Sequence, residues 1–324
     1  MSGVKSKIVL VSPAAQEANN GNWHTAHRWS KFLSTYCDIA ITQHSDRADE
    51  NLDIMIALHA RRSAPSIHAW AKQQPTKPLI VVLTGTDLYR DIQTDADAKK
   101  SLELATHLVV LQDAGVAALP AHLRSKARVI YQSAPRLKPA VKAKQRLAAV
   151  MVGHLRDEKD PLTFINASRL CKSKTVGFEQ IGDGLDAALT KAANLAVAKQ
   201  NNYSWLGGLP RSETRQRIKR AHVLVNCSLM EGGAHVILEA VQSSTPVLAS
   251  RISGNVGMLG DDYAGYFGVG DAAGLAKLVD RCAAEPAFLL SLQQQCNKRA
   301  KLFEPALEKR LVLKLVKDAL KHTP

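Results

Sequence analysis

The stretch SLMEGGAHVILEA, residues 228–240, decides how the rest of the chain is interpreted. It follows a short apolar run that ends near Asn226, passes through Gly232 and Gly233, and continues with helical spacing. A strand that turns through glycines into a helix leaves backbone N–H groups free to bind phosphate. The stretch therefore predicts a phosphate-binding turn at the end of a strand.

Two glutamates, Glu231 and Glu239, flank this turn. Eight positions of helix at 1.5 Å each would separate them by about 12 Å, which suits a ligand that extends from a ribose across a diphosphate to a sugar. We expect Glu239 to accept hydrogen bonds from ribose hydroxyls and Glu231 to accept them from a hexose. The alternative is a surface role for Glu239, but the apolar run 236–238 precedes it, so we expect a buried helix and a partner for this carboxylate.

Apolar runs alternate with helical stretches along the whole sequence, which predicts parallel sheets covered by helices. In the first half, strands are expected at 7–13, 38–42, 54–58, 79–83, 107–111 and 128–131, with the first helix at 24–33. In the second half, strands are expected at 147–152, 178–181, 203–206, 223–226 and 246–249, and helices at 162–171, 185–199, 212–221, 234–243, 272–301 and 305–321.

The break between the halves is rich in Pro, Lys and Ala. We expect an α/β fold with a Rossmann-like domain at 1–137, a linker at 138–146, a second Rossmann-like domain at 147–304, and a last helix, 305–324, that crosses back. Ligands of open α/β sheets lie beyond the carboxyl ends of the strands, so we expect the site in a cleft between the domains. Two unrelated α/β domains are the alternative.

Composition narrows the class of protein. A length of 324 residues suits two domains, and no apolar run approaches the ~20 residues of a membrane span. The first 13 residues lack a signal-peptide cleavage site. Five scattered cysteines form neither a disulfide framework nor a zinc motif, which favours the reducing cytoplasm: Cys37, Cys171, Cys227, Cys282 and Cys296.

The net charge of +14 is spread over the chain. The one all-cationic run, Lys138, Lys142, Lys144 and Arg146, is interpreted as a solvated linker. A diffuse positive field suits small anionic substrates, so we expect no nucleic-acid partner and no stable membrane association. No D-x-D element lies in a strand-end loop, and we expect no metal and no cofactor. The sequence does not predict an oligomeric state.

The E-x7-E pattern of residues 231–239 resembles the retaining family 4 glycosyltransferases, which have the two-Rossmann GT-B fold. Residues 152–159, VGHLRDEK, resemble the family segment whose Arg and Lys neutralise the donor diphosphate; Lys159 matches the lysine, His154 replaces the usual arginine, and Arg156 is expected to take its place. IGDG, 181–184, and WLGG, 205–208, resemble the loops beside the nucleoside base. The resemblance implies donor-binding residues at Gly153, His154, Gly182, Gly207, Gly232, Gly233, Ala234 and Glu239, and catalytic residues at Glu231, Lys159 and Arg156.

Three loops of the first half follow strands and are expected to open onto the same cleft: GNWHTAHR at 21–28, LHARRSA at 58–64 and LTGTDLYRD at 83–91. They offer imidazole, guanidinium and hydroxyl groups, which suit a small oxyanion, and no broad apolar groove for a lipid. The alternative is that Arg61 and Arg62 make ordinary ion pairs.

These loops, with QSA at 132–134, GNVG at 254–257 and YAGYF at 263–267, resemble the selenosugar synthase family of selenoneine biosynthesis. The resemblance implies a reaction of a UDP-sugar with selenophosphate that gives a 1-selenosugar, UDP and phosphate. Selenium in selenophosphate is already anionic, so positioning and stabilisation of the leaving diphosphate suffice. The implied acceptor residues are His24, Thr25, Arg28, His59, Arg61, Arg62, Thr84 and Thr86, with Asp87 catalytic and Gly21 and Asn22 near the donor phosphates.

Three other functions compete with this interpretation. The first is a hexosyltransferase that acts on a hydroxyl of a lipid or glycan, which would need a base. The second is a non-catalytic nucleotide-sugar-binding protein, against which the presence of both Glu231 and Glu239 argues. The third is a nucleic-acid binder, which the even spread of charge disfavours.

Overall fold

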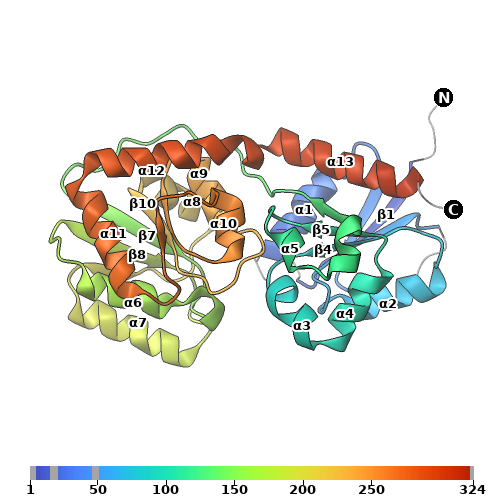
Figure 1. Ribbon diagram of the computed structural model, residues 1–324, viewed down its shortest axis with the longest axis horizontal. Coiled ribbons are helices and arrows are strands. Elements are labelled where there is room, and N and C mark those ends of the chain that lie inside the picture. The colour runs from blue at the N-terminus through green and yellow to red at the C-terminus, as the bar shows by residue number, and fades with distance from the viewer. Residues whose placement is uncertain (1–4, 15–20, 46–50, 322–324) are drawn as a thin grey trace. The chain divides into compact units, whose positions relative to one another are not determined.

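The computed structural model describes residues 5–14, 21–45 and 51–321. The chain divides into two compact units, which Figure 1 shows. The first unit comprises Met1–Gln132 with Pro305–Pro324, and the second comprises Ser133–Glu304. In the described part of the chain, no helix is both long and apolar enough to cross a membrane.

The first unit has a six-stranded parallel sheet in the order β2-β1-β3-β4-β5-β6. Its strands are β1 (Lys7–Val11), β2 (Asp38–Thr42), β3 (Ile54–Leu58), β4 (Leu79–Leu83), β5 (His107–Val110) and β6 (Ala127–Val129). Strands β3 and β4 are buried along their whole length, as their continuous apolar runs predict for a sheet covered on both faces.

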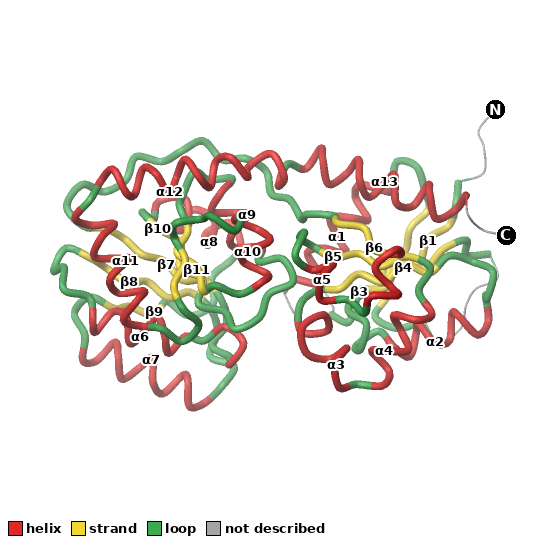
Figure 2. The backbone as a smooth tube through the Cα atoms, in the orientation of Figure 1, coloured by secondary structure: helices red, strands yellow, loops and turns green. Residues whose placement is uncertain are grey.

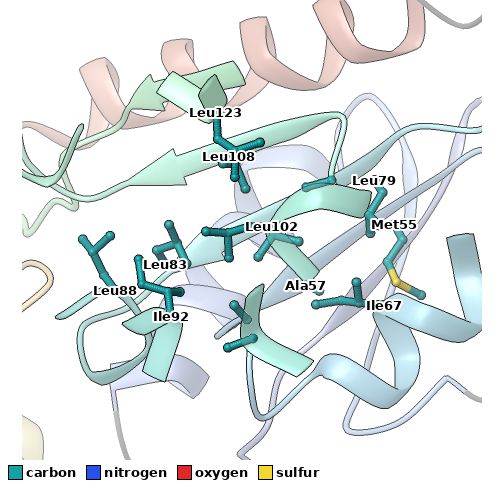
Figure 3. Close-up of a cluster of buried hydrophobic side chains, with 14 of the residues drawn as sticks. Met55, Ala57, Ile67, Leu79, Leu83, Leu88, Ile92, Leu102, Leu108 and Leu123 are labelled. Carbon is teal, nitrogen blue, oxygen red and sulfur yellow. The ribbon is translucent and has the colours of Figure 1, made fainter. Parts of the chain in front are cut away.

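Helices cover both faces of this sheet (Figure 1). On one face lie α1 (Gly21–Leu33) and α13 (Pro305–Lys321), which bury Trp29 and Val312 against the strands. On the other face lie α2 (Ala64–Gln73), α4 (Ala96–Leu104) and the π-helix η2 (Asp87–Asp91). Figure 3 shows the core on that side, where Ile67, Leu88 and Leu102 meet the strands. Short segments complete the unit: α3 (Ile92–Thr94), α5 (Gly115–Ala118) and η3 (Ala121–Lys126).

The second unit also has a sheet with helices around it (Figure 2). Its strand order is β12-β11-β10-β7-β8-β9, and all pairs are parallel. Its strands are β7 (Leu147–Val152), β8 (Val176–Ile181), β9 (Tyr203–Trp205), β10 (Val223–Asn226), β11 (Val247–Ser250) and β12 (Tyr266–Phe267). Its helices are α6 (Pro161–Leu170), α7 (Ala187–Lys199), α8 (Arg211–Arg220), α9 (His235–Val241), α10 (Ser253–Leu259), α11 (Ala272–Ala284) and α12 (Pro286–Arg299), with η4 (Asp157–Lys159) and η5 (Ala300–Phe303).

The structure differs from the sequence-based elements at several ends, and three of these differences have a clear local form. The helix expected over 272–301 is two helices, α11 and α12, because Pro286 cannot donate the hydrogen bond that would continue the first. Strand β12 was not predicted, since two residues carry no periodic signal. The helix expected over 234–243 is shorter, because α9 ends at Val241.

The segment expected as a linker, residues 138–146, belongs to the second unit. Lys142 is half-buried, and its Nζ donates to the carbonyl of Lys219 at 2.7 Å and to Thr245 Oγ1 at 3.1 Å. Burial, with a smaller effect from the charge of Lys219, lowers the pKa of Lys142 to about 8. The interpretation of this run as a solvated face is therefore wrong for Lys142, which fastens the segment to the end of α8.

A buried carboxylate holds α13 on the first unit. Glu308 is fully buried; it accepts from Arg28 Nε at 2.7 Å, from Arg28 Nη2 at 3.0 Å and from Trp29 Nε1 at 2.8 Å. Arg28 was expected to bind an acceptor, but this two-pronged ion pair with a residue 280 positions away directs its guanidinium into the fold. We therefore assign Arg28 a structural role.

Glu308→Ala should lower the free energy of unfolding by about 3 kcal/mol, because it leaves the largely buried Arg28 and Trp29 without their acceptor. Urea denaturation measures the change. Glu304→Ala, an exposed carboxylate four residues earlier, is the matched control and should change stability little. Equal midpoints for the two variants would show that Glu308 does not hold the helix.

Candidate functional site

An ion pair lies where the loops after β7 and β10 meet. Lys159 Nζ donates to Glu231 Oε1 at 2.5 Å, and Ser228 Oγ donates to the same oxygen at 2.7 Å. The Lys159 side chain is 19% exposed and the Glu231 side chain 11%. The Leu229 N–H also donates to the Glu158 carbonyl at 2.9 Å, which joins the two loops through their backbones. The structure thus brings together two residues that lie 72 positions apart and that were expected to act in one site.

The carboxylate of Glu231 is held in its charged form. Burial would raise its pKa, but the charge and hydrogen bond of Lys159, with hydrogen bonds from Ser228 and Asn226, hold the pKa below its ordinary value. A Cβ at position 254 would overlap the Glu231 carbonyl oxygen, so Gly254 permits the close approach of the α10 backbone. Glu231 is therefore fixed as an acceptor beside a cation.

The glycine loops after β7, β8 and β9 are packed backbone to backbone. The Gly182 N–H donates to the Gly207 carbonyl at 2.8 Å, and Trp205 Nε1 donates to the Gly182 carbonyl at 2.8 Å. Gly182 has φ +145°, and a Cβ there would overlap the Gly153 carbonyl. Only glycine satisfies both conditions at this position.

The loop after β7 carries His154 and Arg156. The Asp183 N–H donates to His154 Nδ1 at 3.0 Å, so neutral His154 carries its proton on Nε2. Burial is the largest of the effects that lower the His154 pKa; Asp183 opposes it, and Arg156 and Lys159 add to it. Arg156 is exposed and lies 4.0 Å from Glu158 Oε2. Arg156 thus adds positive charge near His154 and Lys159 without being locked in place.

The turn that was predicted to bind phosphate precedes α9. Gly232 and Ala234 are buried and Gly233 is half-buried. Within the described residues, the N–H groups of these three residues donate no hydrogen bond, so they are available to a ligand. Helix α9 starts only at His235, so the estimate of 12 Å from helical rise does not apply to Glu231, which lies in the loop.

Glu239 is buried on α9 and has cationic partners. Its Oε1 accepts from Arg211 Nη2 at 3.0 Å and Nε at 3.2 Å, and it lies 3.8 Å from Arg215 Nε and 3.7 Å from His235 Nδ1. Burial would raise the Glu239 pKa, but His235 and Arg211 lower it to about 2. The expected partner of this carboxylate is therefore present, and a hydroxyl ligand would share the carboxylate with Arg211.

In the first unit, the loop after β3 holds His59 in a strained conformation, with φ +71°. The Arg62 N–H donates to His59 Nδ1 at 3.3 Å, and His59 Nε2 lies 3.0 Å from Thr86 Oγ1. Burial, the largest effect, lowers the His59 pKa. Because Nδ1 is the acceptor, Nε2 carries the proton and donates to Thr86, whose own hydroxyl hydrogen can point to a ligand.

Asp87 organises the same loops. It is fully buried, its Oδ1 accepts from the N–H groups of Thr84 at 2.9 Å and Gly85 at 2.8 Å, and its Oδ2 accepts from the Ala60 N–H at 3.0 Å. Because Asp87 has no exposed surface in addition to these three donors, it does not face a substrate. We therefore assign Asp87, expected to be catalytic, the role of holding the loops after β3 and β4 together.

Arg61 is anchored at this edge, and Arg62 is not. Arg61 Nε donates to Asp91 Oδ2 at 2.8 Å, and Arg90 Nε donates to Asp91 Oδ1 at 3.1 Å. Arg62 is exposed and makes no ion pair with a described residue. The alternative, that both arginines make ordinary ion pairs, therefore holds for the Nε of Arg61 and does not hold for Arg62.

The beginning of α1 holds the other expected residues. Gly21 is exposed, and Asn22 and His24 are half-buried and have partners within the fold. Thr25 is buried, and its Oγ1 donates to the Gly21 carbonyl at 2.8 Å and accepts from Gln132 Nε2 at 2.5 Å. We therefore interpret Thr25 as a residue that packs α1 against the end of β6 rather than as an acceptor ligand.

Sequence reasoning missed the partners of the two glutamates. Asn226 ends an apolar strand and Ser228 begins the diagnostic stretch, and a polar residue at such a strand end is a usable signal. Arg211 stands at the start of α8, where its charge opposes the helix dipole. That unfavourable position was the available sign of a tertiary partner. Across the described ranges, no group of three His, Cys, Asp or Glu residues could hold a metal ion.

The chain is similar to known proteins in its sequence and in its fold. The profile of the family described as Glycosyl transferases group 1 matches residues 136–303. The chain resembles Glycosyltransferase 1 domain-containing protein 1 of Xenopus tropicalis at 35% identity over 108 residues, which are 33% of this chain and 31% of that protein. The chain thus matches less than a third of the length of that relative.

Solved structures resemble the whole chain. HepE of Anabaena in complex with UDP-glucose superposes with a TM-score of 0.79 at 13% identity, over 96% of this chain and 99% of that one. Sucrose-phosphate synthase of Thermosynechococcus elongatus superposes with a TM-score of 0.79 at 14% identity, over 98% and 100%. At these identities the likeness shows the fold.

Gly182→Ala should lower the free energy of unfolding by about 2–5 kcal/mol, because strain at positive φ adds to overlap with the Gly153 carbonyl. Gly207→Ala is the matched control, since its φ is +67° but a Cβ there meets nothing within 4 Å, and it should cost only about 1–2 kcal/mol. Thermal or urea unfolding compares the two. Equal losses would show that close packing of the loops contributes nothing.

Proposed function

This chain belongs to the glycosyl transferases group 1 family and is a glycosyltransferase of the GT-B fold, and from that premise we propose that it transfers a hexosyl group from a UDP-sugar to selenophosphate. The products are a 1-selenosugar, UDP and phosphate. The proposal places the donor at the strand ends of the second unit and the acceptor at those of the first.

Donor binding is supported by the turn before α9 and by Glu239. The three unbonded N–H groups of residues 232–234 suit phosphate oxygens. Glu239 is ionised, and Arg211 occupies only its Oε1 by hydrogen bonds, so its carboxylate retains acceptor capacity for ribose hydroxyls. HepE, which has the same fold, was crystallised with UDP-glucose, and this supports a UDP-sugar as the donor.

Lys159 supplies the electrostatics of the transfer step. When the bond from the anomeric carbon to the diphosphate breaks, the electron pair goes to the diphosphate oxygen and negative charge grows there. An ammonium already held by Glu231 needs little reorganisation to stabilise that charge. We propose for the same reason that the step needs no metal ion. Glu231 is proposed to accept from the hexose with the capacity that Lys159 and Ser228 leave.

The acceptor assignment rests on one observation in the first unit. In the loops 59–64 and 84–91, every potential base is occupied: Asp87 by backbone amides, Asp91 by arginines, and His59 Nδ1 by the Arg62 N–H. A hydroxyl acceptor would need a base to remove its proton. Selenophosphate needs none, because its selenium is anionic, and it suits the positive charge of Arg61 and Arg62.

The proposed reaction has two steps. Selenium attacks the anomeric carbon, a carbon–selenium bond forms, and UDP leaves. Water then attacks phosphorus, the phosphorus–selenium bond breaks, and its electron pair returns to selenium. One water is consumed, and one phosphate is released for each UDP.

Product analysis tests this proposal. We expect the purified protein, given a UDP-sugar and selenophosphate, to form a selenosugar by mass spectrometry, with equal amounts of UDP and phosphate released, and to do so equally in EDTA. Sugar alcohols and glycans in place of selenophosphate should give UDP release at least 100-fold slower. Rapid transfer to a hydroxyl acceptor, without dependence on selenophosphate, would overturn the acceptor assignment. Activity that EDTA abolishes and magnesium restores would overturn the metal-free step.

A further inference from the structure

We propose that Asp91 is a positioning residue that orients Arg61 to bind a tetrahedral oxyanion at the strand ends of the first unit, while Arg90 pairs with its other carboxylate oxygen. The three residues are called the Asp91 clamp below. Its assignment to selenophosphate rests on the proposed function, but the binding of an oxyanion by the clamp does not.

The geometry of the clamp leaves Arg61 able to bind a ligand. Asp91 is 6% exposed at its side chain, whereas the Arg61 side chain is 39% exposed and that of Arg90 is 45%. The Nε of Arg61 donates to one carboxylate oxygen of Asp91, and the Nε of Arg90 donates to the other. The terminal nitrogens of Arg61 donate to no described residue. Both terminal NH2 groups of its guanidinium therefore remain for a forked contact with two oxyanion oxygens.

A hydroxyl donor lies beside the clamp. His59 Nε2 lies 3.9 Å from Asp91 Oδ2 and 3.0 Å from Thr86 Oγ1, so Thr86 and Asp91 share one side of the imidazole. Since His59 donates to Thr86, the Thr86 hydroxyl hydrogen is free for a further acceptor. Half-buried Thr86 can thus add an O–H donor to the N–H donors of Arg61.

The charges of the loop favour an anion. Burial would raise the pKa of Asp91, but Arg61 and Arg90 lower it below its ordinary value, so the clamp carries one negative and two positive charges. Asp87 adds a second negative charge, which its three backbone donors stabilise, and exposed Arg62 adds a third positive charge. The loop therefore keeps a net positive charge although it contains two aspartates.

The Asp91→Asn variant distinguishes a role in orienting the arginines from a simple effect of charge, because the two would change the affinity for an anion in opposite directions. Removal of a negative charge would by itself strengthen anion binding. If Asp91 orients the arginines, the substitution should instead weaken it. We expect inorganic phosphate, followed through the amide NMR signals of Gly85 and Thr86, to bind Asp91→Asn at least fivefold more weakly than the unsubstituted protein. Signals at this loop report on this site even if phosphate also binds in the second unit.

Further variants test the same proposal through the partners of Asp91. Arg61→Lys should weaken phosphate binding about threefold or more, because an ammonium cannot make the forked contact. Asp91→Asn should add little in the Arg61→Ala background if it acts through Arg61. Glu103→Gln, an exposed carboxylate of the same unit that pairs with His122, is the matched control and should leave phosphate binding unchanged. Should Asp91→Asn fail to fold, the Arg61→Lys and Arg90→Lys variants carry the test.

Unchanged or tighter phosphate binding by Asp91→Asn would overturn the proposal, as would equal effects of that substitution with and without Arg61. The outcomes also separate the clamp from the proposed reaction. If phosphate binding depends on the clamp but no selenosugar forms, the oxyanion site stands and its assignment to selenophosphate is wrong. If a selenosugar forms and its rate is insensitive to Asp91→Asn and Arg61→Lys, the clamp is not the acceptor site.

Discussion

The contact between Lys159 and Glu231 is the constraint on which the candidate site of the second unit depends. It ties the loop after β7 to the loop after β10, and it requires the side chain of Lys159 to cross Gly153, where a Cβ would lie 3.3 Å from Lys159 Cγ. Gly182 then packs on the Gly153 backbone, and Gly254 packs on that of Glu231. The ion pair and the glycines are therefore one arrangement: small residues bring the loops close, and the paired charges hold them there.

In the first unit, acidic and basic side chains also hold loops together, but the two kinds of side chain have different roles. Asp87 and Asp91 are buried and occupied, the first by amides and the second by arginines, so neither presents a free carboxylate to a ligand. The guanidinium groups of Arg61 and Arg62 are left at the surface. Aspartates that would otherwise repel an anion are thus used to build the loop. This division of roles makes an acidic segment, TGTDLYRD, compatible with the proposed oxyanion site.

Much of the fold could be predicted from apolar runs, because a strand buried on both faces, such as β3 or β4, has no polar position. The strand ends followed from the same pattern, whereas Lys159 was identified by its resemblance to a family segment and Glu231 by its place beside the glycine turn. The partners of several polar residues could not be predicted in this way. Arg28 follows the first strand, where a ligand was expected, but it pairs with Glu308. The two residues lie 280 positions apart, and no sequence pattern links them. Asp87 looks catalytic by type, and only its three backbone donors show that it is structural.

The most direct measurement is the effect of Lys159→Ala on single-turnover sugar transfer, compared with its effect on the Kd for the UDP-sugar. If Lys159 stabilises charge that develops on the leaving diphosphate, the rate should fall about 10²–10³-fold while the Kd changes less than about fivefold. Lys159→Arg should recover part of the rate. A rise in Kd with an unchanged transfer rate would contradict this account, because it would place Lys159 in ground-state binding alone.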